Sequence, residues 1–129
     1  MSGTEVRLKG EELTCAISAS MVRLYGEHYG HDRTTGTTYI NDNVVVCVLE
    51  GILTTGESSQ VADGGAKEVI GGRIAFQEGM QDEFTEEIER LTQRRVTAFM
   101  SANQTSPGVA SELFFLEAPP VPRQLESVD

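Results

Sequence analysis

The chain has 129 residues, of which 39% are hydrophobic and 23% are charged, and it contains no Trp. This length and composition are typical of one globular domain that can build its own core. Asp and Glu outnumber Lys and Arg by 20 to 10, giving a formal net charge of −10, which argues against binding to nucleic acid or directly to anionic lipid because both need clustered basic residues.

The two ends of the chain differ in composition from its middle. Residues 1–10 lack the apolar stretch of a secretory signal, and we expect them to be a flexible N-terminus. Residues 118–129 contain three prolines, which predicts an extended or disordered tail. The longest apolar run has six residues, against the about 20 that a membrane-spanning helix needs. We therefore expect a soluble, cytoplasmic protein with a single domain over residues 11–117.

An amphipathic helix is the first predicted element, from about residue 10 to residue 28. Leu13, Ile17, Met21 and Leu24 recur at intervals of three or four residues and so share one helical face.

Residues 37–49 predict a β-hairpin. Two runs rich in β-formers, residues 37–40 and 44–49, flank Asn41, Asp42 and Asn43. Asn and Asp tolerate the positive φ angles that tight hairpin turns require.

Two helical segments are predicted after this hairpin. Thr54 and Glu57 have the spacing of a capping box, which predicts a short helix to about residue 61. Apolar residues then keep helical spacing from residue 66 to residue 91, which predicts a long helix. Gly71 and Gly72 weaken its first turns.

Two strands complete the predicted α+β fold. They cover residues 96–100 and 112–116, with a polar loop over residues 101–108. Because tight hairpins join antiparallel strands, we predict a two-layer sandwich in the order α-β-β-α-β-β, with a four-stranded antiparallel sheet.

The predicted strands are apolar on both faces. In residues 44–49 and 113–116, odd and even positions are equally apolar, whereas a sheet wet on one side alternates with polar residues. Helices cover one face, and the other presents roughly 330 Å², an area typical of an interface. We therefore predict a homodimer or another protein partner, unless the short helix, a loop or the tail covers the second face.

No catalytic or metal-binding motif is visible. The chain lacks a P-loop and a Gly-x-Ser-x-Gly motif. His28 and His31, with Asp32 beside them, have no further ligand at a suitable spacing. Cys15 and Cys47 form no CxxC pair, and we expect both to be packed inside. We therefore predict no cofactor, no metal and no enzymatic activity.

Several charged or polar residues stand out by position. Asn41 and Asp42 lie at the predicted hairpin tip, and Glu50 ends the apolar strand. Arg73 lies within the apolar start of the long helix, where an ion pair with Glu50 or Glu57 is expected.

The long helix also carries an acidic face. Its candidate interaction residues are Glu83, Glu86 and Glu87. This face either docks on a basic loop of a membrane protein or only keeps the protein in solution.

Residues 39–54 resemble the signature of the MpsC-like domain. They read Tyr-Ile-Asn-Asp-Asn-Val-Val-Val-Cys-Val-Leu-Glu-Gly-Ile-Leu-Thr. Further similar segments are Arg73 with residues 76–78, residues 91–92 with residues 95–96, residues 98–101 and residues 112–117. The resemblance covers about residues 11–117. The family is named for the C component of a Na+-translocating, membrane-potential-generating system.

The sequence departs from the family pattern in two places. Residues 93–95 are Gln-Arg-Arg where the family often has Gly-Arg-Lys, and Gln104 stands where a His is common. Any chemistry done by that His elsewhere in the family would be missing here.

The resemblance implies a small soluble component linked to membrane ion or inorganic-carbon transport, and it implies no catalytic residues. The favoured function is therefore a non-catalytic accessory or regulatory protein. The alternative is a small-molecule sensor or enzyme, with a pocket between the hairpin of residues 41–43 and the long helix.

Overall fold

The computed structural model describes residues 10–30 and 33–120. Its elements follow in the order α1 (Gly10–Tyr29), β1 (Thr35–Asn41), β2 (Val44–Glu50), α2 (Thr55–Ala62), α3 (Ala66–Gly79), α4 (Gln81–Thr92), β3 (Val96–Thr105) and β4 (Gly108–Leu116). The predicted α+β class, the four-stranded antiparallel sheet and the order of helical and strand segments along the chain are confirmed. The expectations for residues 1–9 and 121–129 lie outside the described residues.

The four strands form one antiparallel sheet in the order β1-β2-β4-β3. The first two strands form the predicted hairpin, and Asp42 in its turn has a φ of 57°, an angle that Asp tolerates better than most residues. On the central strands, Val46 pairs with both Tyr39 of β1 and Leu113 of β4. Strands β1 and β3 are therefore the two edges.

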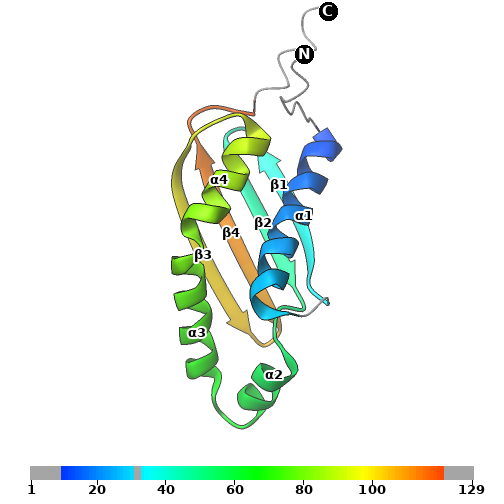
Figure 1. The fold of residues 1–129 in the computed structure, drawn as a ribbon, viewed down its shortest axis with the longest axis vertical. Coiled ribbons are helices and arrows are strands. Elements are labelled where there is room, and N and C mark those ends of the chain that lie inside the picture. The colour runs from blue at the N-terminus through cyan, green and yellow to red at the C-terminus, as the bar shows by residue number, and fades with distance from the viewer. Residues whose placement is uncertain (1–9, 31–32, 121–129) are drawn as a thin grey trace, which may run out of the picture.

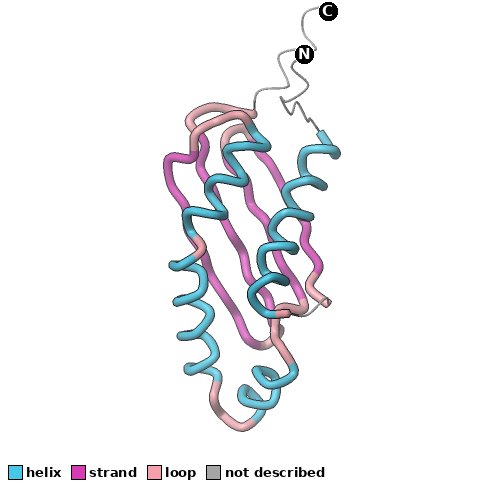
Figure 2. The backbone as a smooth tube through the Cα atoms, viewed as in Figure 1, coloured by secondary structure: helices cyan, strands magenta, loops and turns pink. Residues whose placement is uncertain are grey.

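The helices α1, α3 and α4 lie on one side of the sheet (Figures 1 and 2). α1 packs on β1 and β2, whereas α3 and α4 pack on β3. The core between the two layers includes the predicted helical face of α1 and the alternate residues of β2 and β4 that point toward it. Its fully buried members include Ile17, Met21, Val45, Leu49, Phe84, Ile88 and Phe114.

The other side of the sheet, which we call the open face, has no cover from any described residue. It comprises the alternate strand residues that point away from the helices, including Tyr39, Val44, Val46, Val48, Met100, Leu113 and Phe115. Tyr39 is 60% exposed and Met100 is 54% exposed, and the others are half-buried. α2 lies at one end of the molecule and does not reach this face (Figure 1).

The segment predicted as one long helix is two helices. The break falls at Met80, whose φ of −99° and ψ of 3° are not helical. The preceding Gly79 is a weak helix former, and Met80 packs against the core. Gly71 and Gly72 instead lie inside α3, with open space where a side chain would be.

The prediction of a loop over residues 101–108 is wrong. β3 continues to Thr105, and only Ser106 and Pro107 form the turn to β4. Residues 101 and 103 looked like loop residues because they are polar, but Ser101 and Asn103 face the helices and bind polar partners there. Their polarity therefore reflects a buried network within a strand.

The predicted capping box of α2 is confirmed. The amide of Glu57 donates to Thr54 Oγ1 at 3.1 Å, and the amide of Thr54 donates to Glu57 Oε1 at 2.9 Å. The link from β2 to this helix turns at Gly51, where φ is +68° and an added Cβ would lie 2.8 Å from the Arg33 carbonyl oxygen. Only glycine fits this turn without strain.

Candidate functional site

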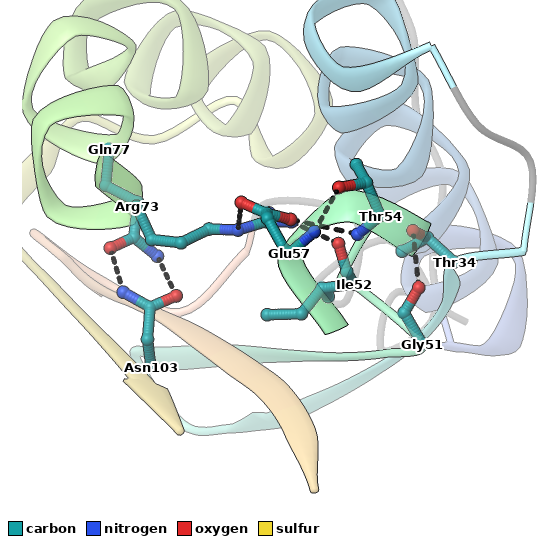
Figure 3. Close-up of polar contacts among 8 residues, drawn as sticks. All are labelled: Thr34, Gly51, Ile52, Thr54, Glu57, Arg73, Gln77 and Asn103. Carbon is teal, nitrogen blue, oxygen red and sulfur yellow. Dashed lines mark hydrogen bonds and ion pairs between the residues drawn. The ribbon is translucent and has the colours of Figure 1, made fainter. Parts of the chain in front are cut away.

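A buried arginine joins α3 to the end of β2. Arg73 is 1% exposed. Its Nε donates to Glu57 Oε2 at 3.2 Å, and its Nη2 donates both to Glu57 Oε1 at 2.5 Å and to the Ile52 carbonyl (Figure 3). Its guanidinium carbon lies 3.7 Å from the centre of the Tyr29 ring. One side chain thus connects α1, α2, α3 and the loop after β2.

The carboxylate partner of this arginine is fixed by the helix cap. Burial acts to raise the pKa of Glu57, but the hydrogen bonds from Arg73 and from the Thr54 amide outweigh it, and the pKa lies below its usual value. Arg73 Nη1 is buried and has no hydrogen-bond partner among the described residues. The electron-rich face of Tyr29 supplies electrostatic compensation to the same guanidinium.

A second polar cluster surrounds Glu112, a fully buried carboxyl on the helix-facing side of β4. Tyr25 Oη donates to its Oε2 at 2.5 Å, Gln77 Nε2 donates to the same oxygen at 2.8 Å, and Ser101 Oγ donates to its Oε1. Burial raises the pKa of Glu112, and these three hydrogen bonds oppose the rise only in part. Burial, together with the nearby Glu112 charge, also raises the pKa of Tyr25.

The two clusters meet on α3 and form one polar seam. Arg73 and Gln77 are four residues apart, and side chains at this spacing share a helical face. The Gln77 and Asn103 amides form a reciprocal pair with distances of 2.6 and 3.3 Å (Figure 3). The polar seam therefore runs from Glu57 near the surface, along the inward side of α3, to Glu112 in the interior.

The polar seam fixes the arrangement of the layers. It ties α1 and α3 to β3 and β4 through Glu112, and α2 to α3 through Arg73. The hydrogen-bonding capacity of both carboxylates is directed toward neighbouring side chains and amides. The hydrogen bonds of the polar seam therefore hold α1, α2 and α3 in fixed positions relative to one another and to the sheet.

Sequence reasoning identified Arg73 but missed Glu112 and its partners. The signal for Glu112 was its place in the strand, because the alternate residues 112, 114 and 116 point to the same side. Phe114 and Leu116 are core residues, so a charged residue in phase with them predicts a buried carboxyl.

The predicted ion pair of Arg73 forms with Glu57 and not with Glu50, which is exposed at the end of β2. Asn41 and Asp42 are exposed at the tip of the β1–β2 hairpin, at the opposite end of β2 from this ion pair. The structure therefore does not bring the hairpin tip together with Arg73.

A shallow depression lies beside the polar seam, at the α2 end of the molecule. It encloses about 390 Å³ and is lined by Arg33, Gly51, Ile52, Leu53, Ser58 and Gly108. The alternative function placed a pocket near the hairpin of residues 41–43, whereas this depression lies at the other end of β2.

Comparison with known families identifies the family of this chain. The family model described as the Na+-translocating membrane potential-generating system (MpsC) matches residues 9–118. The chain belongs to the MpsC family. No curated protein and no solved structure matches it. Among the described residues, no helix of this MpsC-family chain has both the length and the apolar character needed to cross a bilayer.

The acidic face of this MpsC-family chain is smaller than the sequence predicts. Glu83 and Glu86 are exposed on α4, as expected. Glu87 is half-buried and accepts hydrogen bonds from Ser20 at 2.8 Å and from Arg90 at 2.6 Å. The hydrogen bond from Arg90 is the main reason that the pKa of Glu87 lies below its usual value. Glu87 therefore joins α4 to α1 and is not a free surface charge.

The histidines and cysteines take different positions. His28 packs on Phe76 at a ring distance of 4.4 Å, while His31 and Asp32 lie outside the described residues. No group of three potential ligands for a metal ion is found in the described part of the chain. Cys47 is buried as predicted, but the prediction for Cys15 is wrong, because it lies on the exposed side of α1.

The departure from the family pattern at residue 104 falls on the open face. Gln104 pairs with Val109 across β3 and β4, and its side chain is exposed. Gln104 is therefore separated from the polar seam, because Ser101 and Asn103 of the seam lie on the opposite, helix-facing side of β3.

Proposed function

We propose that this chain is a non-catalytic accessory or regulatory component of a Na+-translocating, membrane-potential-generating system, acting through protein–protein binding. The observation that carries this proposal is the open face, whose centre is apolar and which has no cover from the described residues. Large exposed apolar surfaces of this kind usually mark interfaces. The association of the family with a Na+-translocating membrane potential-generating system supports the link to membrane ion transport. Inorganic-carbon transport is the second candidate process.

The proposed site of action is the cytoplasmic side of the membrane, through a membrane-protein partner. The net charge of −10 disfavours contact with anionic lipid and with nucleic acid. The same charge favours the basic loops that membrane proteins display on their cytoplasmic side. Glu83 and Glu86 are the exposed charges that we assign to this contact.

The test is recovery of the partner from native membranes with the tagged full chain. We expect an integral membrane protein, identified by mass spectrometry, whose recovery falls as salt rises. The double variant Glu83→Lys and Glu86→Lys should lose it. Glu87 is left unchanged because it also holds α4 against α1.

A matched control is the variant Glu11→Lys and Glu12→Lys. It makes the same change of charge in the first turn of another helix, also at exposed positions. Equal losses in both double variants would indicate a nonspecific charge effect and refute docking through α4. Failure of the wild type to recover any membrane protein would refute the proposed function.

The second candidate function is a small-molecule sensor or enzyme. The observation favouring it is the depression of about 390 Å³ beside Arg33, a volume within the range of ligand sites. A thermal-shift screen over nucleotides, bicarbonate, Na+ and divalent cations separates the two. We expect no reproducible shift, whereas a rise of several degrees with one ligand would favour the sensor or enzyme.

A further inference from the structure

We propose that the open face is the interface between two copies of this chain. The inference deepens the proposed function by naming the occupant of the open face, and it rests on that function only in treating this face as a protein-binding surface. The membrane-protein partner is then left to the acidic residues of α4, which lie on the other layer of the molecule.

The centre of the open face is apolar, and polar residues such as Thr37, Ser111 and Gln104 lie around it. Its central strands contribute Val46, Val48, Leu113 and Phe115, and its edge strands contribute the exposed Tyr39 and Met100. Aromatic residues and Met are enriched at protein interfaces, whereas charged residues are depleted from interface cores. Of the strand residues that point to this face, Glu50 carries the one carboxylate, and it stands at the end of β2.

The size of the open face matches a dimer interface. The strands have 7, 7, 10 and 9 residues, which at about 3.4 Å by 4.8 Å per residue gives a flat area of roughly 540 Å². The accessible surface of a face covered with side chains exceeds its flat area. It therefore approaches the about 800 Å² per partner of a standard interface and lies well above most crystal contacts.

Charge favours a second copy at this face and disfavours lipid. Two chains that each carry −10 repel one another over most of their surface. The open face has almost no charge, so two copies approach there without placing carboxylates opposite one another. A lipid surface would instead be attracted by Lys and Arg beside the apolar residues, and the strand residues of the open face include none.

The expected arrangement is two sheets packed face to face, about 10 Å apart, around a two-fold axis. Val46 and Leu113 are neighbours on the two central strands, so a two-fold axis through the middle of the face places both at the centre of the interface. Tyr39 and Met100 lie on opposite edge strands and form its flanks. Both layers of helices then face outward.

The first experiment measures the mass of the full chain in solution by light scattering after size exclusion. The wild type should be a dimer at micromolar concentration, with twice the chain mass of 14.0 kDa. Leu113→Lys should be a monomer. Because Leu113 is half-buried, the double variant Tyr39→Lys and Met100→Lys changes only exposed side chains, and it should raise the dimer dissociation constant at least ten-fold.

The matched control is Ile74→Lys, which changes an apolar residue with 45% exposure on the outer side of α3. It should leave the dimer intact. Circular dichroism of each variant verifies the fold. A monomeric wild type at tens of micromolar, or a dimer disrupted by Ile74→Lys and not by the open-face variants, overturns the proposal.

A second measurement uses the wild type alone. Met100 is 54% exposed in the single chain, so hydrogen peroxide should oxidise it readily in dilute solution. Its oxidation should slow at least several-fold as the protein concentration passes the dissociation constant. An oxidation rate that stays constant while the chain dimerises would place the interface elsewhere and overturn the proposal.

Three further outcomes separate this inference from lipid binding and from the proposed function. Binding of the wild type to anionic vesicles at physiological salt, lost in Leu113→Lys, would make lipid the occupant and overturn the dimer. A dimer that recovers no membrane protein supports this inference while the proposed function fails. A monomer that recovers a membrane protein through α4 supports the proposed function and overturns this inference.

Discussion

Removing the guanidinium of Arg73 should destabilise the fold more than removing any surface arginine. In Arg73→Met the stem is retained, but Glu57 loses its cationic partner and the Ile52 carbonyl loses a donor. Breaking a buried ion pair by deleting one partner costs about 3–5 kcal/mol. Because the Glu57 side chain is 20% exposed and keeps its bond to the Thr54 amide, we expect about 2–4 kcal/mol.

The measurement is urea unfolding followed by circular dichroism, which yields the free energy of unfolding when the transition is two-state. For a domain of this size, 2–4 kcal/mol corresponds to a fall in Tm of roughly 10 °C. Arg90→Met is the matched control. Arg90 also pairs with a glutamate at 2.6 Å, but its side chain is 54% exposed, so its loss should cost about 0–1 kcal/mol.

A double-mutant cycle tests whether the loss comes from the ion pair. Glu57→Gln alone removes the same pair from the other side, and the two changes together should cost about 1–3 kcal/mol less than their sum. A loss below about 1 kcal/mol in Arg73→Met, or additive effects in the cycle, would refute the assignment of Arg73 as the connection between α2 and α3.

Three further predictions follow from burial and strand order. Because the pKa of Glu112 is raised by folding, its contribution to stability is complete below the unfolded-state pKa and is lost as the pH rises through the folded-state pKa; the free energy of unfolding of the wild type minus that of Glu112→Gln should therefore fall as the pH rises above about 4.3, the ordinary pKa of Glu, and a rise would contradict the direction of the shift. A thiol reagent should label exposed Cys15 in the native chain but label Cys47 only after unfolding, because burial raises the pKa of Cys47 to about 11; equal labelling rates would contradict its burial. Amide exchange should be slowest in the central strands β2 and β4, and faster in the edge strands β1 and β3; a most protected β3 would contradict the strand order.

Local signals in the sequence were sufficient for the hairpin and for α2. The turn at Asp42 and the capping box of Thr54 and Glu57 each depend on residues within four positions of one another. Because neighbouring residues alone determine the geometry of such a turn or cap, these elements form where the pattern predicts them.

Elements that depend on tertiary contacts were not predictable in the same way. Apolar spacing continues across Met80, so periodicity alone gives one helix where packing gives two. Ser101 and Asn103 resemble loop residues until Glu112 and Gln77 are seen opposite them. A polar side chain in a strand needs a buried partner, and the partners here lie up to 26 positions away.

The two faces of β2 differ in whether folding of a single copy buries their side chains. Val45, Cys47 and Leu49 face the helices and are fully buried in one copy. Val44, Val46 and Val48 point the other way and remain half-buried, although polar residues at these positions would allow the same chain to fold. Folding of one copy therefore does not explain why Val44, Val46 and Val48 are apolar. A partner that covers the open face does account for it, since it removes from water the surface that the helices leave uncovered.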